Sequence, residues 1–290
     1  MQIRCHERRC DRITRGSRTV GDTETLGIAH LNLAMAAHGI LKDVTWAGEA
    51  LIEPGRLVFR GRIGSAHKHA HAALQIVTLT DGAVSLSDAD GQRLSASAAV
   101  IAAGAAHSID TGTGSGVMVY LEPTSVVGRQ VTRLFGSTIR PDVHEWVRLG
   151  AGILNIDARQ PLSSAADDVI ARLVGPKEQA SGALHHSVEA VVGMLPDMLS
   201  GPVKLTDVAK AVHLSADRLG RLMAQEVGMS FPAYVRWSRL IRAMAVARDG
   251  GTITDAAHAA GFSDSSHANR AFHEMFGLAP IDARRGVRLT

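Results

Sequence analysis

Four histidines and a glutamine with regular spacing are the residues of this sequence best suited to chemistry. His67, His69 and His71 are each separated by one residue, Gln75 follows four residues later, and His107 lies further along the chain. On a β-strand, residues spaced by two point to the same side. His69, His71 and Gln75 can therefore share one interior wall. His67 joins this wall if the strand extends far enough.

Three interpretations of this group stay open. The group can hold Zn²⁺ or a similar divalent transition metal, because imidazole nitrogens are ligands that these ions favour; the expected ligands are His69, His71, His107 and, more weakly, Gln75. The same four residues and His67 can instead line a metal-free polar pocket for a small effector, or the histidines can serve structure alone. Residues 60–119 contain no Phe, Tyr or Trp, which argues against a sugar effector, because sugar rings stack on aromatic faces.

The sequence around the histidines predicts short strands joined by tight turns. Asp81-Gly82 and Asp90-Gly91 are strong hairpin signals within residues 44–121. A run of short strands with such turns is typical of an antiparallel sandwich or barrel.

The pattern changes to a helical period in residues 125–200. Leu184, Val188, Val191, Val192 and Leu195 form one apolar stripe on a predicted helix. The stripe can pack on its own domain or form a dimer seam. For the second case the expected contacts are Leu184, Val188 and Val192.

The C-terminal ninety residues predict a helix-turn-helix. Residues 205–223 form two short amphipathic helices with a break at His213 and Leu214. Ala209 is the small residue at the helix crossing, and Ser215 is expected to cap the second helix.

The same pattern returns about forty-eight residues later. Ala257, Gly261 and Ser263 stand where Ala209, His213 and Ser215 stand in the first unit. Gly261 supplies the positive φ that a tight turn often requires. One helix, predicted to begin at Ser230 and to end at Asp249, joins the two units.

Two such units in order on a basic segment resemble the DNA-binding domain of the AraC/XylS family of transcription regulators. The resemblance covers residues 203–285 and is carried by LTDVAKAVHLSADRLGRLM (205–223), SFPAYV (230–235), RLIRAMAVA (239–247) and ITDAAHAAGFSDSSHANRAFHEMFGLAP (253–280). The last stretch is close to the family's most specific signature. His213 replaces the usual turn glycine, and Ala268 replaces a bulky apolar residue.

The histidine region resembles the cupin barrel. Its first motif has His-x-His, then three residues and an acid, then six residues and a glycine, here Gly82. Its second motif is echoed by Gly104 and His107. Gln75 replaces the usual acid, and Ala102 the usual proline. A cupin-like sensor is also what the AraC/XylS family commonly places before its DNA-binding half.

The resemblance implies that the second helix of each unit enters the DNA major groove with its N-terminal residues at base edges. The expected base-edge residues are Ala216, Asp217, Arg218 and Arg221 in the first unit and Ser265, Ser266, His267, Asn269 and Arg270 in the second. Lys204, Arg236 and Arg239 are expected to contact phosphates. Arg221 and Arg270 can read guanine, clamp phosphate or form surface ion pairs.

The distribution of charge along the chain separates the same two regions. Residues 201–290 hold twelve basic and eight acidic side chains, whereas residues 21–200 are acidic, which favours a polyanionic partner for the basic end. We predict an α+β protein with a flexible basic arm (1–25), a cupin-like antiparallel β-barrel as sensor (26–125), a helical dimerisation or linker segment (126–200) and an all-α DNA-binding domain with two helix-turn-helix motifs (201–290).

The predicted function is that of a sequence-specific transcription regulator controlled by a small effector or a metal. Its expected partners are double-stranded operator DNA, the effector, a second copy of the chain and RNA polymerase. No apolar run reaches about 18 residues, so we expect no membrane partner. The two cysteines, Cys5 and Cys10, both lie in the basic arm, which excludes a disulfide framework and predicts a reducing cytoplasm as the location. The alternatives are a metal-dependent cupin enzyme with a helical appendage and an architectural DNA binder without ligand control.

Overall fold

The computed structural model describes residues 45–112, 114–136, 141–153, 156–157, 159–175 and 183–290. The predicted basic arm and the first part of the predicted sensor domain lie outside these residues. Among the described helices, none is both long enough and apolar enough to cross a membrane.

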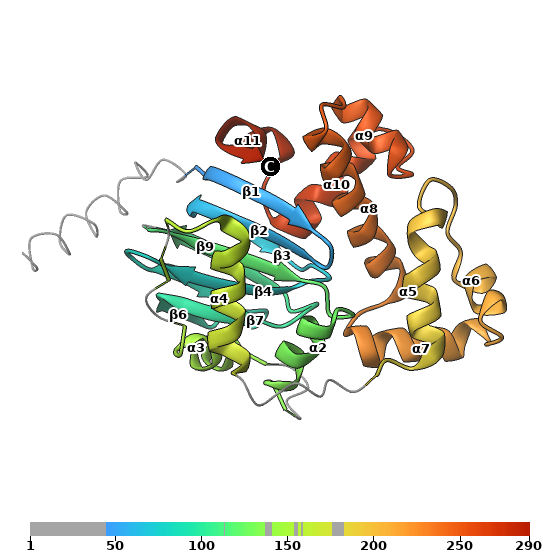
Figure 1. Ribbon diagram of the computed structural model, residues 1–290, viewed down its shortest axis with the longest axis horizontal. Coiled ribbons are helices and arrows are strands. Elements are labelled where there is room, and N and C mark those ends of the chain that lie inside the picture. Colours follow the sequence, from blue (N-terminus) through green and yellow to red (C-terminus); the bar gives the residue numbers. More distant parts are fainter. Residues whose placement is uncertain (1–44, 113, 137–140, 154–155, 158, 176–182) are drawn as a thin grey trace, which may run out of the picture. The chain divides into compact units, whose positions relative to one another are not determined.

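The N-terminal part of the described chain is built from two β-sheets (Figure 1). The larger sheet has the strand order β10-β1-β2-β9-β4-β7, and the smaller one has the order β3-β8-β5-β6. The strands are β1 (Ala47–Glu53), β2 (Arg56–Arg62), β3 (Ala66–His69), β4 (Leu74–Leu79), β5 (Val84–Ser87), β6 (Arg93–Ala96), β7 (Ala98–Ile101), β8 (His107–Gly112), β9 (Ser115–Leu121) and β10 (Val287–Leu289).

The predicted antiparallel β-architecture is confirmed, in the form of a double sheet and not of one closed barrel. One passage of the chain between the sheets is at Ser97, which joins β6 to β7. Both predicted turn glycines, Gly82 and Gly91, have positive φ. At the second turn the Asp88 carboxylate accepts hydrogen bonds from the backbone N–H groups of Asp90 and Gln92, as an Asx-type turn requires.

Helices follow the strands: α2 (Val126–Arg133), α3 (Val143–Gly150), α4 (Leu162–Val174) and α5 (His186–Met198). Helix α3 begins at its cap Asp142, whose side chain accepts the Glu145 N–H. The helix packs on β7, and its Trp146 side chain is fully buried. A Cβ atom at Gly150 would lie 2.5 Å from the Ala99 nitrogen, so only glycine lets this helix approach the strand so closely.

The apolar stripe of α5 is used within the chain. Val188, Val191 and Leu195 are buried, and the helix packs against the first predicted recognition helix. Val188 is therefore not exposed for the predicted dimer seam, because its side chain is already covered; Leu184 and Val192 are half-buried.

The C-terminal helices follow the predicted order: α6 (Leu205–Ala211), α7 (Ala216–Val227), α8 (Phe231–Arg248), α9 (Ile253–Ala259), α10 (Ser265–Phe276) and α11 (Pro280–Gly286). Both turns have the expected left-handed residue, with φ of 56° at His213 and 77° at Gly261. Ser215 caps α7 as predicted. The cap of α10 is Asp264 and not Ser263, because the Asp264 carboxylate accepts the His267 N–H.

The end of the chain returns to the N-terminal sheet, which the sequence pattern did not indicate. β10 pairs in parallel with β1, and the Arg288 guanidinium contacts the Glu49 carboxylate at 2.9 Å. The backbone N–H of Thr290 also donates to the Ala50 carbonyl. The last residues of the predicted all-α domain therefore belong to the larger sheet.

We predict that Gly150→Ala lowers the free energy of unfolding by about 1–3 kcal/mol, because a methyl group has no room against the β7 backbone. Urea denaturation of both variants measures this. Gly152→Ala is the matched control, since nothing lies within 4 Å of the position of its added Cβ, and its change should stay within about 0.5 kcal/mol. Equal stability of the two variants would contradict the close α3–β7 packing.

Candidate functional site

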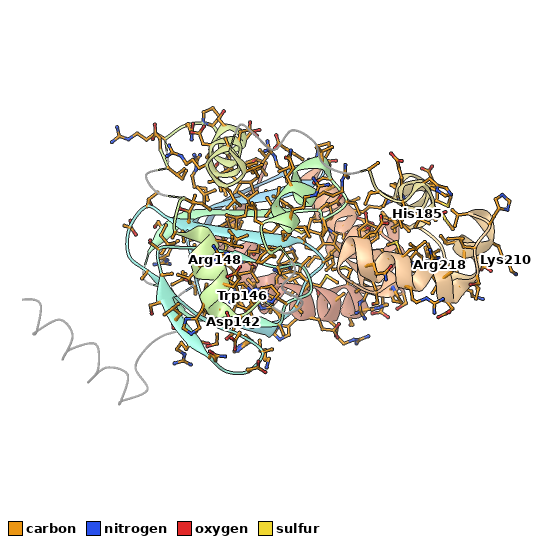
Figure 2. All side chains as sticks on the ribbon, turned by 90° about the horizontal axis from the view of Figure 1, so that it is seen from below. Asp142, Trp146, Arg148, His185, Lys210 and Arg218 are labelled. Atoms are coloured by element: carbon orange, nitrogen blue, oxygen red, sulfur yellow. The ribbon has the colours of Figure 1, made fainter. Side chains whose placement is uncertain are left out.

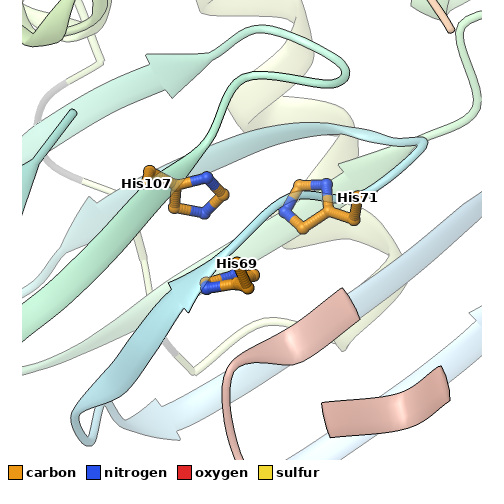
Figure 3. A group of neighbouring side chains, drawn as sticks. All are labelled: His69, His71 and His107. Carbon is orange, nitrogen blue, oxygen red and sulfur yellow. The ribbon is translucent and has the colours of Figure 1, made fainter. Parts of the chain in front are cut away.

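Three of the predicted histidines and the glutamine come together where the two sheets meet. His69 ends β3, His71 follows it, His107 begins β8 of the same sheet, and Gln75 lies on β4 of the other sheet. One ring nitrogen from each histidine lies within 4.8 Å of the others, and Figure 3 shows the three rings turned toward one another. All four side chains are buried. We call these four residues the histidine cluster.

His67 is not part of the histidine cluster, although its spacing predicted that it could be. Its side chain is exposed. The pairing of β3 with β8 shifts register between Ala66 and His69, so the simple alternation of faces does not hold along this strand.

The outer nitrogen of each ring is held by the backbone. The Nδ1 atom of each cluster histidine lies next to a carbonyl oxygen, which can only accept a hydrogen bond. Each Nδ1 therefore carries the proton, and each Nε2 keeps a lone pair. The distances are 2.7 Å from His69 to His67 O, 2.8 Å from His71 to Ala73 O and 2.9 Å from His107 to Ala105 O. Metal-binding histidines commonly have this outer hydrogen bond to a carbonyl or carboxylate.

The structure places the Oε1 atom of Gln75 between two of the Nε2 atoms, 2.8 Å from that of His71 and 3.0 Å from that of His107. With its NH₂ group toward the rings, the amide donates a hydrogen bond to each lone pair. With its oxygen toward them, it offers an oxygen ligand to an ion bound by the rings. Rotation of one amide thus suits both arrangements.

Burial keeps the cluster uncharged. It lowers the pKa of His69 to about 3 and also lowers the pKa values of His71 and His107. Neutral imidazole is the form that binds a metal ion. The donor set therefore fits a divalent transition metal that accepts nitrogen ligands.

Aromatic side chains from outside residues 60–119 surround the histidine cluster. The His71 ring lies 5.2 Å from the Tyr120 ring and 6.2 Å from that of Trp237 on α8, and the His107 ring lies 6.1 Å from that of Trp146. The absence of aromatic residues from 60–119 argued against a sugar effector, but the folded site does contain aromatic rings. No local pattern could have shown this, because these residues come from three distant elements.

Two arginines of the predicted DNA-contacting set are exposed and have no ion pair within the described chain. Arg218 lies in the first turns of α7, and Arg270 lies in the first half of α10. Figure 2 shows Arg218, with Lys210 of α6, at the surface of the helical region. Among the other predicted contacts, Asp217, Ser266, Lys204 and Arg236 are exposed, and Ala216, Ser265 and His267 are half-buried.

Two other predicted contacts have different surroundings. Arg221 forms an ion pair with Asp217 at 2.9 Å. Arg239 is half-buried, donates to the Gly201 carbonyl at 2.7 Å and has a lowered pKa because of burial. Part of its guanidinium is therefore held within the fold, and a phosphate contact by Arg239 stays a prediction.

Asn269 is exposed, but it also lines an apolar cavity of about 190 Å³. The walls of this cavity come from β1, β2 and helices α8 to α11, with Phe59, Met244 and Phe272 among the lining side chains. Asn269 and Phe272 lie on the same face of α10. The helix thus presents Arg270 and Asn269 in different directions.

Comparisons with known proteins bear on both halves of the chain. Residues 208–286 match the family model described as a helix-turn-helix domain. The transcriptional activator RhaR of Pectobacterium atrosepticum is 33% identical over 101 residues, which are 34% of this chain and 36% of RhaR. RhaS of the same organism is 29% identical over 140 residues, 46% of this chain and 50% of RhaS. The chain thus spans between about a third and a half of the length of these two relatives.

A solved structure shares the fold over most of the chain. The crystal structure of an apo ToxT variant from Vibrio cholerae has a TM-score of 0.53 and 11% identity, with 80% of this chain and 97% of that chain covered. Residues 208–286 therefore form a helix-turn-helix domain, and the predicted resemblance of the C-terminal region to the AraC/XylS family agrees with this match and with the two relatives.

Proposed function

We propose that the protein is a sequence-specific DNA-binding transcription regulator whose DNA binding responds to a ligand in the histidine cluster. The observation that supports this most is the pair of helix-turn-helix units with exposed arginines near the starts of both recognition helices, α7 and α10. Both RhaR and RhaS carry the name of transcriptional activators.

For DNA binding, we propose that the two recognition helices contact two neighbouring turns of one duplex. Recognition helices enter successive major-groove faces when they lie about 34 Å apart. Arg218 and Arg270 are then the residues that read base edges, each able to bind guanine through two hydrogen bonds. Lys204 and Arg236 contact phosphates and contribute affinity without sequence preference.

The sensing half of the proposal rests on the donor set of the histidine cluster. His69, His71 and His107 would hold a divalent transition metal, Zn²⁺ in the first instance, through their Nε2 atoms, and Gln75 would add an oxygen ligand. A bound ion of this kind supplies a structural cross-link. The backbone carbonyls that accept from Nδ1 fix the ring orientations in advance, which lowers the entropic cost of binding.

The proposal also includes self-association and contact with RNA polymerase, but it assigns no residues to either interaction. The enzyme alternative finds no support in the relatives, which are named as transcriptional activators. The architectural alternative leaves the ordered donor set of the cluster without a role.

We predict that Arg218→Ala and Arg270→Ala each relax sequence preference in one half of a bipartite site and weaken binding by about 1–3 kcal/mol. Selection of duplexes from a random library by the full chain, repeated for each variant at fixed salt, measures this. The two affected regions should lie about 10 base pairs apart.

Arg172→Ala is the matched control for these two substitutions, because it removes one exposed positive charge from α4. Its selected sequences should equal those of the unaltered chain. Unchanged preference in both recognition-helix variants would contradict the assigned base contacts.

We predict that the full chain binds one Zn²⁺ ion, measured by calorimetry after removal of metal. His71→Ala should lose this binding. Gln75→Glu should strengthen it by about tenfold or more, because a carboxylate is a better ligand than an amide. A gain of Zn²⁺ affinity cannot come from misfolding. Gln75→Glu therefore tests the site even if His71→Ala fails to fold. His144→Ala removes an exposed histidine of α3 and should leave the affinity unchanged. Equal Zn²⁺ binding by all four proteins would contradict the site.

A further inference from the structure

We propose that Gly277 and His67 form a joint through which the occupancy of the histidine cluster is transmitted to the second recognition helix, α10. This inference rests on the proposed function of the cluster. It assigns a positioning role to two residues that neither bind the ligand nor contact DNA.

The joint consists of consecutive hydrogen bonds that share one residue. The backbone N–H of His67 donates to the carbonyl of Gly277 at 2.8 Å, and Gly277 is the C-cap residue that follows α10. The His67 carbonyl in turn accepts from Nδ1 of His69 at 2.7 Å. His67 therefore uses both of its backbone groups to connect a cluster ring to the end of the helix.

The atoms around Gly277 are packed too closely to leave room for a side chain at this position. Gly277 has a φ of 68°, and a Cβ atom there would lie 2.4 Å from the His67 carbonyl oxygen and 2.6 Å from His69 Nδ1. The exposed ring of His273, one turn earlier on α10, lies 6.1 Å from the His67 ring. Close-packed atoms transmit small displacements. A change in the position of the His69 ring therefore moves the end of α10 or breaks the hydrogen bond between His67 and Gly277.

A second contact reaches the same helix from the other side of the cluster. The His71 ring is next to Trp237 of α8, and the Trp237 ring lies 6.0 Å from that of Phe276, the last residue of α10. Phe276 also meets Tyr120 edge to face at 5.7 Å. Two cluster histidines are thus connected to the final turn of α10.

Within the described residues, the end of the first recognition helix has no hydrogen bond to the cluster region like that of Gly277, although a Cβ atom at Gly104 would lie 3.1 Å from the Gly228 carbonyl oxygen. This helix also ends at a left-handed glycine, Gly228, with a φ of 79°. A Cβ atom at Gly228 would meet Ala103 at 3.7 Å, which is ordinary van der Waals contact. Gly228 therefore provides a matched position, with similar backbone geometry at the end of a recognition helix but with room for an added Cβ atom.

The test uses the full chain and Zn²⁺ alone as the probe. Hydrogen exchange of the segment 265–278 is measured with and without saturating Zn²⁺ for the unaltered protein, Gly277→Ala and Gly228→Ala. We expect Zn²⁺ to slow exchange in the last turn of α10 by about fivefold or more in the unaltered protein and in Gly228→Ala. In Gly277→Ala the ion should still bind, with weaker affinity, but should no longer slow exchange in α10.

His273→Ala tests the same joint if Gly277→Ala fails to fold, because His273 is exposed and its substitution should not disturb folding. It should reduce the Zn²⁺ effect on α10 at least by about half, whereas His258→Ala, an exposed histidine of α9, should leave it unchanged. Zn²⁺ binding without slower exchange in α10, or an effect that persists in both Gly277→Ala and His273→Ala, would overturn the joint. Failure of the unaltered chain to bind Zn²⁺ would overturn the metal site as well, while the selected DNA sequences report on the regulator independently.

Discussion

The hydrogen bonds from the three imidazole Nδ1 atoms to backbone carbonyls are the interactions on which the proposed sensing site depends. They fix the protonated nitrogen of His69, His71 and His107 outward and leave three lone pairs directed toward one another. Burial keeps the rings neutral, which preserves those lone pairs. Without the outer bonds, the rings could rotate and the same residues would form an ordinary polar interior.

The same interactions connect the histidine cluster to α10, the second helix of the second helix-turn-helix unit. The carbonyl that orients His69 belongs to His67, whose N–H group is bonded to the end of α10. The last strand, β10, holds the C-terminus to β1 through Arg288 and Glu49. Sheet and second helix-turn-helix are thus connected on both sides of α10. Under the proposed function, a ligand that stabilises one arrangement of this connection would change DNA affinity, and DNA would change ligand affinity by the same factor.

Local patterns predicted the parts of the molecule that depend on neighbouring residues. The two helix-turn-helix units follow from capping and turn residues close in sequence, and even the unusual left-handed His213 was expected. Strand alternation predicted the members of the cluster but not their placement, because His71 follows β3 and Gln75 lies on β4 of the other sheet. It also failed for His67, where the register shifts. Tertiary contacts decided the rest: the burial of Val188 and the internal bond of Arg239 depend on neighbours that are distant along the chain.

The most direct test of the central claim is the affinity of the full chain for its own selected duplex, measured across a Zn²⁺ titration at constant salt. A coupled regulator predicts a change of about fivefold or more in DNA affinity as the histidine cluster fills, and no change in a His71→Ala protein. Constant DNA affinity in the unaltered chain, with Zn²⁺ shown to be bound, would contradict the account.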